Sequence, residues 1–299
     1  MVVLITGTGR CGTHTIFHMF DRIEGCIALH EGRGKVNGKT VDLGDFKAVN
    51  ISSRLDLQDE RIERVKEESF KRRKDLIDST NKHIIDVNRM GYRMIEYYDE
   101  NIDDVKFVHL VRNGYDCVRS WYSRKSIYPD LSILTSIMKH YFAKLRSEPE
   151  YIKKTIESVY AYYRKDKITN NKIETMNEKN QFNYAVEKPI PDNKSFWNRY
   201  RRIEKISWYW MYVNKFIKKE LKKLDQEKSK VVRIEDINKG KMEEILSFLS
   251  IKYEHGYDKI GKHDTSKKKY EWNSKDISLF NKICGDIMEE MGYGLTNPC

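Results

Sequence analysis

Residues 7–14 combine side-chain types and spacing that suggest a chemical role. The segment contains three glycines, Gly7, Gly9 and Gly12. The polar side chains of Arg10, Thr13 and His14 lie between and after them. Glycine tolerates positive φ angles and lets a ligand approach the backbone closely, so successive N–H groups can converge on an anion. An amphipathic segment follows, and the N-terminus of a helix there would add partial positive charge. The spacing predicts a phosphate-binding loop.

Two known loops match the glycine spacing only in part. Gly7 and Gly12 are spaced as in the nucleotide triphosphatase P-loop, but Thr13 and His14 stand where that loop needs Lys and a magnesium-binding hydroxyl. Triphosphate chemistry is therefore disfavoured. Gly7, Gly9 and Gly12 also spell GxGxxG, and Glu31 falls about 20 residues further on, as in dinucleotide-binding folds. An NAD(P)-dependent oxidoreductase is thus an alternative.

A third loop fits more of the letters. Arg10 to Thr13, RCGT, resembles the 5′-phosphosulfate loop of sulfotransferases that use 3′-phosphoadenosine 5′-phosphosulfate (PAPS). That family has Lys or Arg, any residue, Gly, then Thr or Ser after its first strand. The resemblance implies that Arg10 is the catalytic cation beside the bridging oxygen. It also implies cofactor contacts from the whole loop: Gly9, Arg10, Cys11, Gly12, Thr13 and His14.

A second segment extends this resemblance. Residues 105–122, VKFVHLVRNGYDCVRSWY, resemble the family's 3′-phosphate segment, in which an Arg ends a strand and a Ser lies on the next helix. Arg112 and Ser120 occupy those places here, and a phosphate needs a charged donor and a hydroxyl on a rigid element. Alternatively, Arg112 pairs with a carboxylate such as Asp116 and Ser120 has no ligand. The two segments together favour the sulfotransferase interpretation.

The remaining matches lie in the C-terminal half. Residues 231–237, VVRIEDI, follow a helix expected around 207–217, and residues 271–293 resemble the family's closing helix. The family often folds a basic loop with two glycines over the 3′-phosphate. This chain has KHDTSKKKYEW at 262–272, without both glycines, so the resemblance assigns an electrostatic role to Lys267, Lys268 and Lys269.

Three residues are candidates for the catalytic base. Glu31 ends a strand expected at 26–30, and some sulfotransferases place a catalytic Glu in a similar location. His30 has a suitable ordinary pKa, but adjacent strand residues point to opposite faces, so only one of the two can serve. Cytosolic sulfotransferases use a His where this chain has Asp86 and Asn88 instead. The base therefore stays open among Glu31, His30 and Asp86.

The elements that must position these residues predict an α/β fold. Mostly uncharged strands are expected at residues 2–6, 26–30, 83–87, 106–111 and 231–234. Such strands are typical of a mainly parallel central sheet with helices on both faces, in three layers. Asn37 and Gly38 predict a hairpin turn, and the segment at 33–50 is a candidate lid or acceptor-binding flap.

Length and composition are consistent with one enzyme-sized domain over residues 1–299, with a helical insertion at 125–205 that shapes the acceptor site. Helices are expected there at 131–146 and 149–164. The net charge of +11 suits a polyanionic cofactor. Nucleic acid is not expected as the main partner, because neither a zinc-finger spacing nor an RNA-recognition signature occurs.

Membrane attachment and disulfides are not expected. The first strand begins at Val2, no apolar run approaches 18 residues, and the five cysteines are odd in number and widely spaced. These features favour a cytoplasmic protein.

The sequence thus predicts transfer of a sulfuryl group from PAPS to a hydroxyl or amine, with adenosine 3′,5′-bisphosphate as product and no metal required. The acceptor stays open among a small molecule, a glycan and a tyrosyl peptide, and so does the oligomeric state. A non-catalytic nucleotide or polyanion binder is a second alternative.

Overall fold

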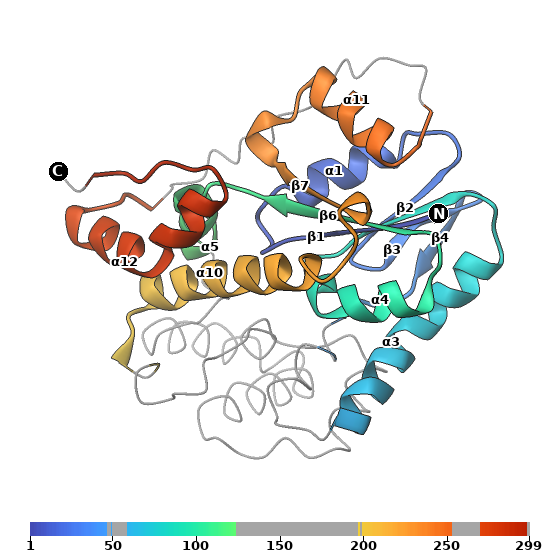
Figure 1. Cartoon of the computed structure of the whole chain (residues 1–299), viewed down its shortest axis with the longest axis horizontal. Helices are drawn as coiled ribbons and strands as arrows, with labels where there is room; N and C mark the ends of the chain where they lie inside the picture. Colours follow the sequence, from blue (N-terminus) through green and yellow to red (C-terminus); the bar gives the residue numbers. More distant parts are fainter. Residues whose placement is uncertain (47–48, 50–58, 124–196, 198, 253–269, 298–299) are drawn as a thin grey trace, which may run out of the picture.

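A computed structural model of the chain describes residues 1–46, 49, 59–123, 197, 199–252 and 270–297 (Figure 1). The expected helices at 131–146 and 149–164, and the lysines at 267–269, lie outside these residues. So does most of the insertion expected at 125–205. Within the part that is described, no helix combines the length and the apolar character needed to span a bilayer.

The described strands form one seven-stranded sheet in the order β4-β3-β2-β5-β1-β6-β7. Their bounds are β1 Val2–Thr6, β2 Cys26–His30, β3 Arg33–Val36, β4 Lys39–Asp42, β5 His83–Val87, β6 Val105–Val111 and β7 Ser229–Arg233. Five of them run parallel, and β3 and β4 extend the sheet as an antiparallel hairpin. An α/β fold around a mainly parallel sheet is therefore confirmed. The last strand begins earlier than expected, at Ser229, and it ends at Arg233 because residues 234–236 form a 3-10 turn.

Helices flank both faces of this sheet (Figure 1). Their bounds are α1 Thr13–Phe20, α3 Asp59–Asp78, α4 Ile95–Asn101, α5 Gly114–Tyr122, α10 Arg202–Leu221, α11 Lys239–Phe248 and α12 Ser274–Glu290. Helices α1 and α11 share one hydrophobic cluster with the sheet, whereas α3, α4, α5, α10 and α12 share the other. Helix α10 begins at Arg202, so the insertion expected to reach residue 205 ends before that point.

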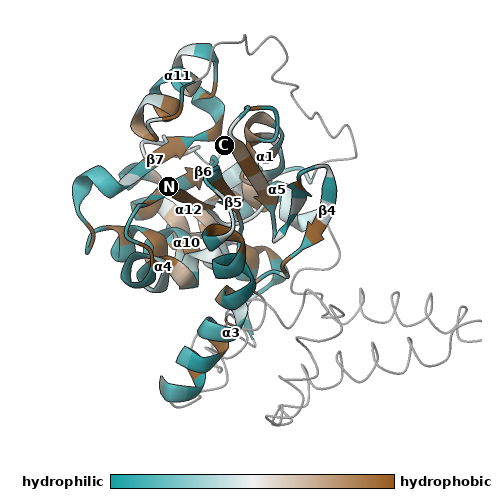
Figure 2. Cartoon of the chain, turned by 90° about the vertical axis from the view of Figure 1, so that its right-hand side faces the viewer, coloured by the Kyte–Doolittle hydropathy of each residue, from teal (hydrophilic) through white to brown (hydrophobic). Residues whose placement is uncertain are grey.

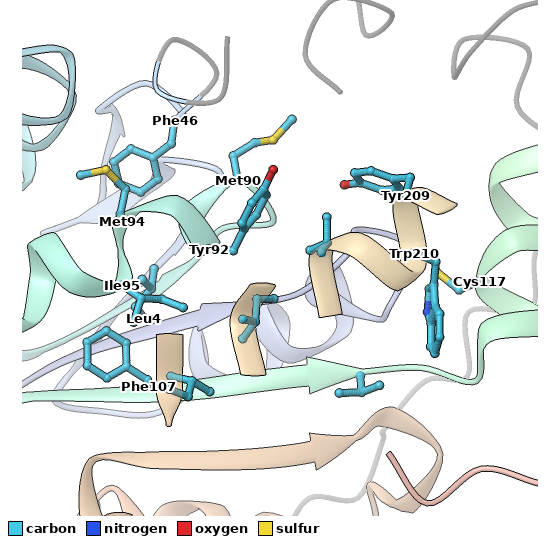
Figure 3. Packing of buried hydrophobic residues seen from close by; sticks show 14 of the residues in the cluster. Leu4, Phe46, Met90, Tyr92, Met94, Ile95, Phe107, Cys117, Tyr209 and Trp210 are labelled. Carbon is cyan, nitrogen blue, oxygen red and sulfur yellow. The ribbon is translucent and has the colours of Figure 1, made fainter. Parts of the chain in front are cut away.

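The strands supply apolar side chains to both clusters because their residues alternate between the two faces. On β1, Val3 and Ile5 face the α1 side, and Leu4 faces the α10 side. Leu4 lies beside Ile95 of α4 and near Phe107 of β6 (Figure 3). Figure 2 shows hydrophobic residues on the central strands, whereas α3 is mostly hydrophilic.

The hairpin expected at Asn37 and Gly38 is present. Both residues have positive φ angles, 49° and 77°, and Val36 pairs with Lys39 across the turn. Positive φ at two consecutive positions matches the twist of the flanking strands. The β3–β4 hairpin follows β2 after the short connection Glu31–Gly32. It therefore lies next in the chain to His30 and Glu31, two of the candidates for the base.

A buried histidine links the sheet to α10. The Nε2 atom of His109 lies 2.9 Å from the Oδ1 atom of Asn214, whose Nδ2 atom donates to the carbonyl oxygen of Trp210 at 2.9 Å. The Asn214 amide therefore presents an acceptor to a neutral histidine. Burial lowers the pKa of His109 from 6.5 to about 4, although the bond to Asn214 opposes that shift.

This pKa predicts acid sensitivity. Between pH 6.5 and about 4 the unfolded chain binds a proton at His109 that the folded chain does not. Stability should therefore fall as the pH falls through this window, by up to about 3 kcal/mol from this group. In urea titrations at a series of pH values, His109→Gln should lose this part of the pH dependence. His18→Gln, on the exposed side of α1, should retain it; equal slopes in both variants would contradict the assignment.

Candidate functional site

The candidate residues gather where the parallel strands end. β1 lies between β5 and β6, so the chain segments that follow these three strands leave the sheet at one edge. In open α/β sheets ligands bind at this carboxyl edge, near the place where the strand order reverses direction. Residues 7–12, 88–89 and 112–113 follow β1, β5 and β6 there.

The loop at 7–12 adopts the backbone that its glycines permit. Gly9, Arg10 and Gly12 have φ angles of 71°, 60° and 95°. Gly12 is the N-cap of α1, so the loop leads directly into the positive end of that helix. A positive φ is unusual for an arginine, and such strain is common where structure serves a site. The loop geometry is thus compatible with binding an anion.

The carbonyl groups of this loop are bound by the elements beneath it. The hydroxyl of Tyr209 donates to the carbonyl oxygen of Thr8 at 2.9 Å, and Trp121 Nε1 donates to that of Gly9 at 3.2 Å. Arg112 Nη1 donates to the carbonyl oxygen of Arg10 at 3.1 Å. Carbonyl oxygens that faced a phosphate would repel it. Because these three oxygens are bound by α5, α10 and Arg112, they point away from the side of the loop where an anion would bind.

The two segments that resemble phosphate-binding motifs meet at Arg10. Its Nε atom donates to the Oγ atom of Ser120 on α5 at 3.0 Å. Arg112 directly follows β6, and its guanidinium donates to the backbone carbonyl oxygen of Arg10. Asp116, the carboxylate considered as a partner for Arg112, instead pairs with Arg119. The structure therefore brings Arg10, Arg112 and Ser120 together.

The other loop residues differ in exposure. The thiol of Cys11 is buried in the α1-side cluster, and burial raises its pKa to about 12. Cys11 can therefore face a ligand only through its backbone, and its thiol stays protonated. Thr13 is buried in the first turn of α1, whereas His14 is exposed and lies 3.3 Å from His18 through their Nε2 atoms.

His30 and Glu31 take different directions from the end of β2. The His30 ring packs against His14 and Phe17 of α1, with ring centroids 5.3 and 5.6 Å away. Burial lowers the pKa of His30, although Glu31 opposes the shift. Among the described residues, these histidines do not form part of a group able to hold a metal ion.

Glu31 lies beside the loop, on a left-handed backbone with φ 52°. Its Oε1 atom accepts a hydrogen bond from Arg89 Nε at 2.5 Å, and the two side chains are 25% and 5% exposed. A Cβ atom built on Gly9 would lie 3.0 Å from Arg89 Cδ, so Arg89 packs directly against the loop. The pair therefore places a carboxylate and a cation at the candidate site.

Asp86 lies inside the sheet, on the α10 side. Its Oδ2 atom accepts from Arg73 Nε at 2.6 Å and from the Tyr98 hydroxyl at 3.0 Å, and the residue is 1% exposed. A carboxylate bound in this way holds neighbouring elements together. The geometry disfavours Asp86 as the base and leaves Glu31 and His30.

Sequence reasoning did not identify several residues of the site. Arg89 lies two residues after the end of a strand that was expected, and a cation at that strand end is a signal that could have found it. Glu235 directly follows the strand expected at 231–234, so a charged residue at a strand end was a signal there as well. Tyr209 carries no such signal. Glu235 accepts from the backbone N–H of Asn113 at 2.8 Å and from the Tyr293 hydroxyl at 2.7 Å. Glu235 thus connects the C-terminal segment to the start of α5, next to Arg112.

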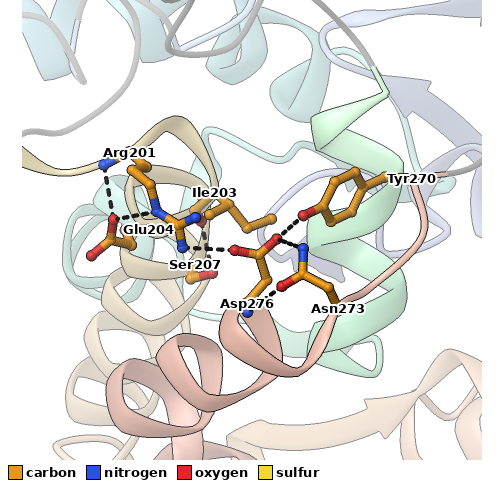
Figure 4. Close-up of polar contacts among 7 residues, drawn as sticks. All are labelled: Arg201, Ile203, Glu204, Ser207, Tyr270, Asn273 and Asp276. Carbon is orange, nitrogen blue, oxygen red and sulfur yellow. Dashed lines mark hydrogen bonds and ion pairs between the residues drawn. The ribbon is translucent and has the colours of Figure 1, made fainter. Parts of the chain in front are cut away.

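A polar cluster joins the starts of α10 and α12 (Figure 4). Asp276 accepts from Arg201 Nη2 at 2.6 Å and from Asn273 Nδ2 at 2.8 Å, and also from the Tyr270 hydroxyl. Burial alone would raise the pKa of Asp276, but the bonds from Tyr270 and Arg201 outweigh it and lower the pKa. The Tyr270 ring lies 4.2 Å from the Tyr122 ring. The chain that follows the lysine run therefore enters the described structure beside α5.

Comparison with known proteins adds no assignment. No protein-family model matches the sequence, and no curated protein matches it. The fold itself bears on the dinucleotide alternative. That fold has the strand order 3-2-1-4-5-6, in which strands 1 and 2 are neighbours, whereas β5 separates β1 from β2 here. The order counts against a standard dinucleotide site at Glu31.

The loop should be intolerant of side chains at Gly9. A Cβ atom there would lie 2.9 Å from Trp121 Cζ2, whereas one on Gly38, which has a similar φ angle of 77°, would meet nothing within 4 Å. Gly38→Ala should therefore cost about 1 kcal/mol from backbone strain alone. Gly9→Ala should cost roughly 1–3 kcal/mol more because Trp121 must shift. Chemical denaturation of both variants measures this difference, and equal losses would argue against tight packing of the loop on α5.

Proposed function

We propose that the chain is a sulfotransferase that transfers a sulfuryl group from PAPS to a hydroxyl or amine acceptor. The observation that carries the proposal is the 3.0 Å contact between Arg10 Nε and Ser120 Oγ. The two residues lie 110 positions apart, and the same family resemblance assigns Arg10 to the 5′-phosphosulfate loop and Ser120 to the 3′-phosphate segment. Both assignments require one shared site, and the contact supports that requirement.

The donor set suits a nucleotide with phosphates at both ends of its ribose. Residues 9–14 would hold the 5′ group through backbone N–H groups and the start of α1, and Arg112 with Ser120 would hold the 3′-phosphate. The left-handed glycines provide room for the backbone to approach a phosphate. By the family resemblance, Lys267, Lys268 and Lys269 would add positive charge for the 3′-phosphate. No metal is required in this proposal, because Arg10 supplies the cation.

When bound, PAPS would supply the sulfuryl group: the bond from sulfur to the phosphate oxygen would break, and a bond from sulfur to the acceptor oxygen or nitrogen would form. Arg10 would stabilise negative charge on the departing phosphate oxygen. Glu31 would accept the proton from the acceptor hydroxyl, and Arg89 would hold that carboxylate in place. His30 is the second candidate for the base, because it lies beside His14 on the α1 side of the same strand end.

The acceptor class stays a matter for screening among small alcohols or phenols, glycans and tyrosyl peptides. The net charge of +11 favours an acidic target. We place the activity in a reducing compartment such as the cytoplasm, because the described cysteines, at positions 11, 26, 117 and 284, are free thiols.

Binding of adenosine 3′,5′-bisphosphate is the direct test of the cofactor assignment. At 100 times its dissociation constant the ligand should stabilise the fold by about 2.7 kcal/mol, a shift of a few degrees in melting temperature. Arg112→Ala should abolish this shift, whereas Arg119→Ala, on the helix α5 that follows Arg112, should keep it because Arg119 is paired with Asp116. A larger shift with NAD or with magnesium-ADP would overturn the proposal.

The base is tested by Glu31→Gln. The amide can still accept from Arg89 but cannot take a proton, so turnover should fall by roughly 10²–10⁴ while bisphosphate affinity stays unchanged. Release of bisphosphate from PAPS with a panel of phenol, glycan and tyrosyl-peptide acceptors measures this. Glu24→Gln, at the opposite end of β2, is the matched control. Near-normal turnover in Glu31→Gln would exclude Glu31 and leave His30 for the same test.

A further inference from the structure

A buried arginine on α3 binds the base of the β3–β4 hairpin. Arg73 is 2% exposed, and its Nη2 atom donates to the carbonyl oxygen of Gly44 at 2.7 Å. Its Nη1 atom donates to the carbonyl oxygens of Leu43 at 3.3 Å and of Ser69 at 3.1 Å. The guanidinium of Arg73 therefore connects helix α3 to Leu43 and Gly44, the two residues that follow β4.

The same guanidinium is fixed to the sheet. Its Nε atom pairs with Asp86 on β5, and the guanidinium carbon lies 4.0 Å from the ring centre of Phe46. Burial alone would lower the pKa of Arg73, but Asp86 and Tyr98 raise it, so the side chain stays charged. A planar group with five donors can serve several acceptors at fixed angles, which a lysine cannot do.

The hairpin base in turn holds the backbone at Glu31. The N–H of Leu43 donates to the carbonyl oxygen of Gly32 at 2.8 Å, and the N–H of Glu31 donates to that of Val87 at 2.9 Å. A Cβ atom on Gly32 would lie 1.8 Å from the Gly44 oxygen, so the two segments are in close contact. The consecutive positive φ angles of Glu31 and Gly32, 52° and 80°, are therefore held from both sides.

We propose that Arg73 is a positioning residue for Glu31, acting through the Leu43–Gly44 backbone and Gly32. The inference rests on the proposed function for the role of Glu31, but the mechanical link can be tested without it. Releasing the hairpin should let Glu31 leave the geometry in which it meets Arg89. A displacement of about 1 Å at a reacting group costs on the order of 10²-fold in rate.

The main variant is Arg73→Lys, which keeps a charge for Asp86 but has only three N–H donors, so it cannot bind Asp86 and three backbone carbonyls at once. Arg72→Met, the exposed neighbour on α3, is the matched control. Should Arg73→Lys fail to fold, the combination Arg73→Met, Asp86→Leu and Tyr98→Phe replaces the whole polar cluster by apolar side chains. Such replacements of buried ion pairs are often neutral for stability.

Hydrogen exchange measures the link directly. Amides in residues 31–46 should exchange about tenfold faster in Arg73→Lys, with residues 105–123 unchanged. Bisphosphate affinity should stay within about twofold, since Arg112 and Ser120 are untouched, and kcat should fall about tenfold or more with the KM for PAPS unchanged. Unchanged exchange at 31–46, or unchanged kcat in an active enzyme, would overturn the inference. A wild-type chain without PAPS turnover would overturn the proposed function, and the exchange result would still decide the mechanical link.

Discussion

The site depends on the central position of β1 in the parallel sheet. With β5 on one side of β1 and β6 on the other, the chain that leaves each strand passes the loop at 7–12. Parallel strands place their carboxyl ends at one edge, so Arg89 and Arg112 become neighbours of a loop far from them in sequence. The contact between Arg10 and Ser120 exists only because this register holds.

The loop keeps its shape because hydrogen-bond donors bind its carbonyl groups from beneath. Tyr209 and Trp121 are buried and donate to the carbonyl oxygens of Thr8 and Gly9. A buried carbonyl without a donor costs roughly 1–3 kcal/mol, so these bonds favour one loop conformation over others. Helices α5 and α10 therefore contribute to the site through these hydrogen bonds, although their buried apolar side chains belong to the hydrophobic core.

The two carboxylates near the second strand, Asp86 and Glu31, serve different purposes. Asp86 lies in the core with Arg73, and such a pair adds little net stability compared with apolar side chains of the same size. Its value lies in the directions that it fixes, because Arg73 binds three backbone carbonyls as well as Asp86. Glu31 is paired with a cation at the rim of the site, where a carboxylate can meet a ligand. The difference in burial thus gives Asp86 a structural role and leaves Glu31 as a candidate for the base.

The sequence by itself determined the five parallel strands, apart from the bounds of β7, the Asn37–Gly38 turn and the positive φ angles at Gly9 and Gly12, because strand patterns and glycine conformation are local properties. It could not decide whether Asp86 or Glu31 was available, because availability depends on Arg73 and Arg89 from other elements. Nor could the sequence show that Tyr209 donates a hydrogen bond to the loop, since an aromatic residue on a helix is more often expected to pack in the hydrophobic core. Only the tertiary structure decided these points, because burial and hydrogen-bond partners arise when distant segments pack together.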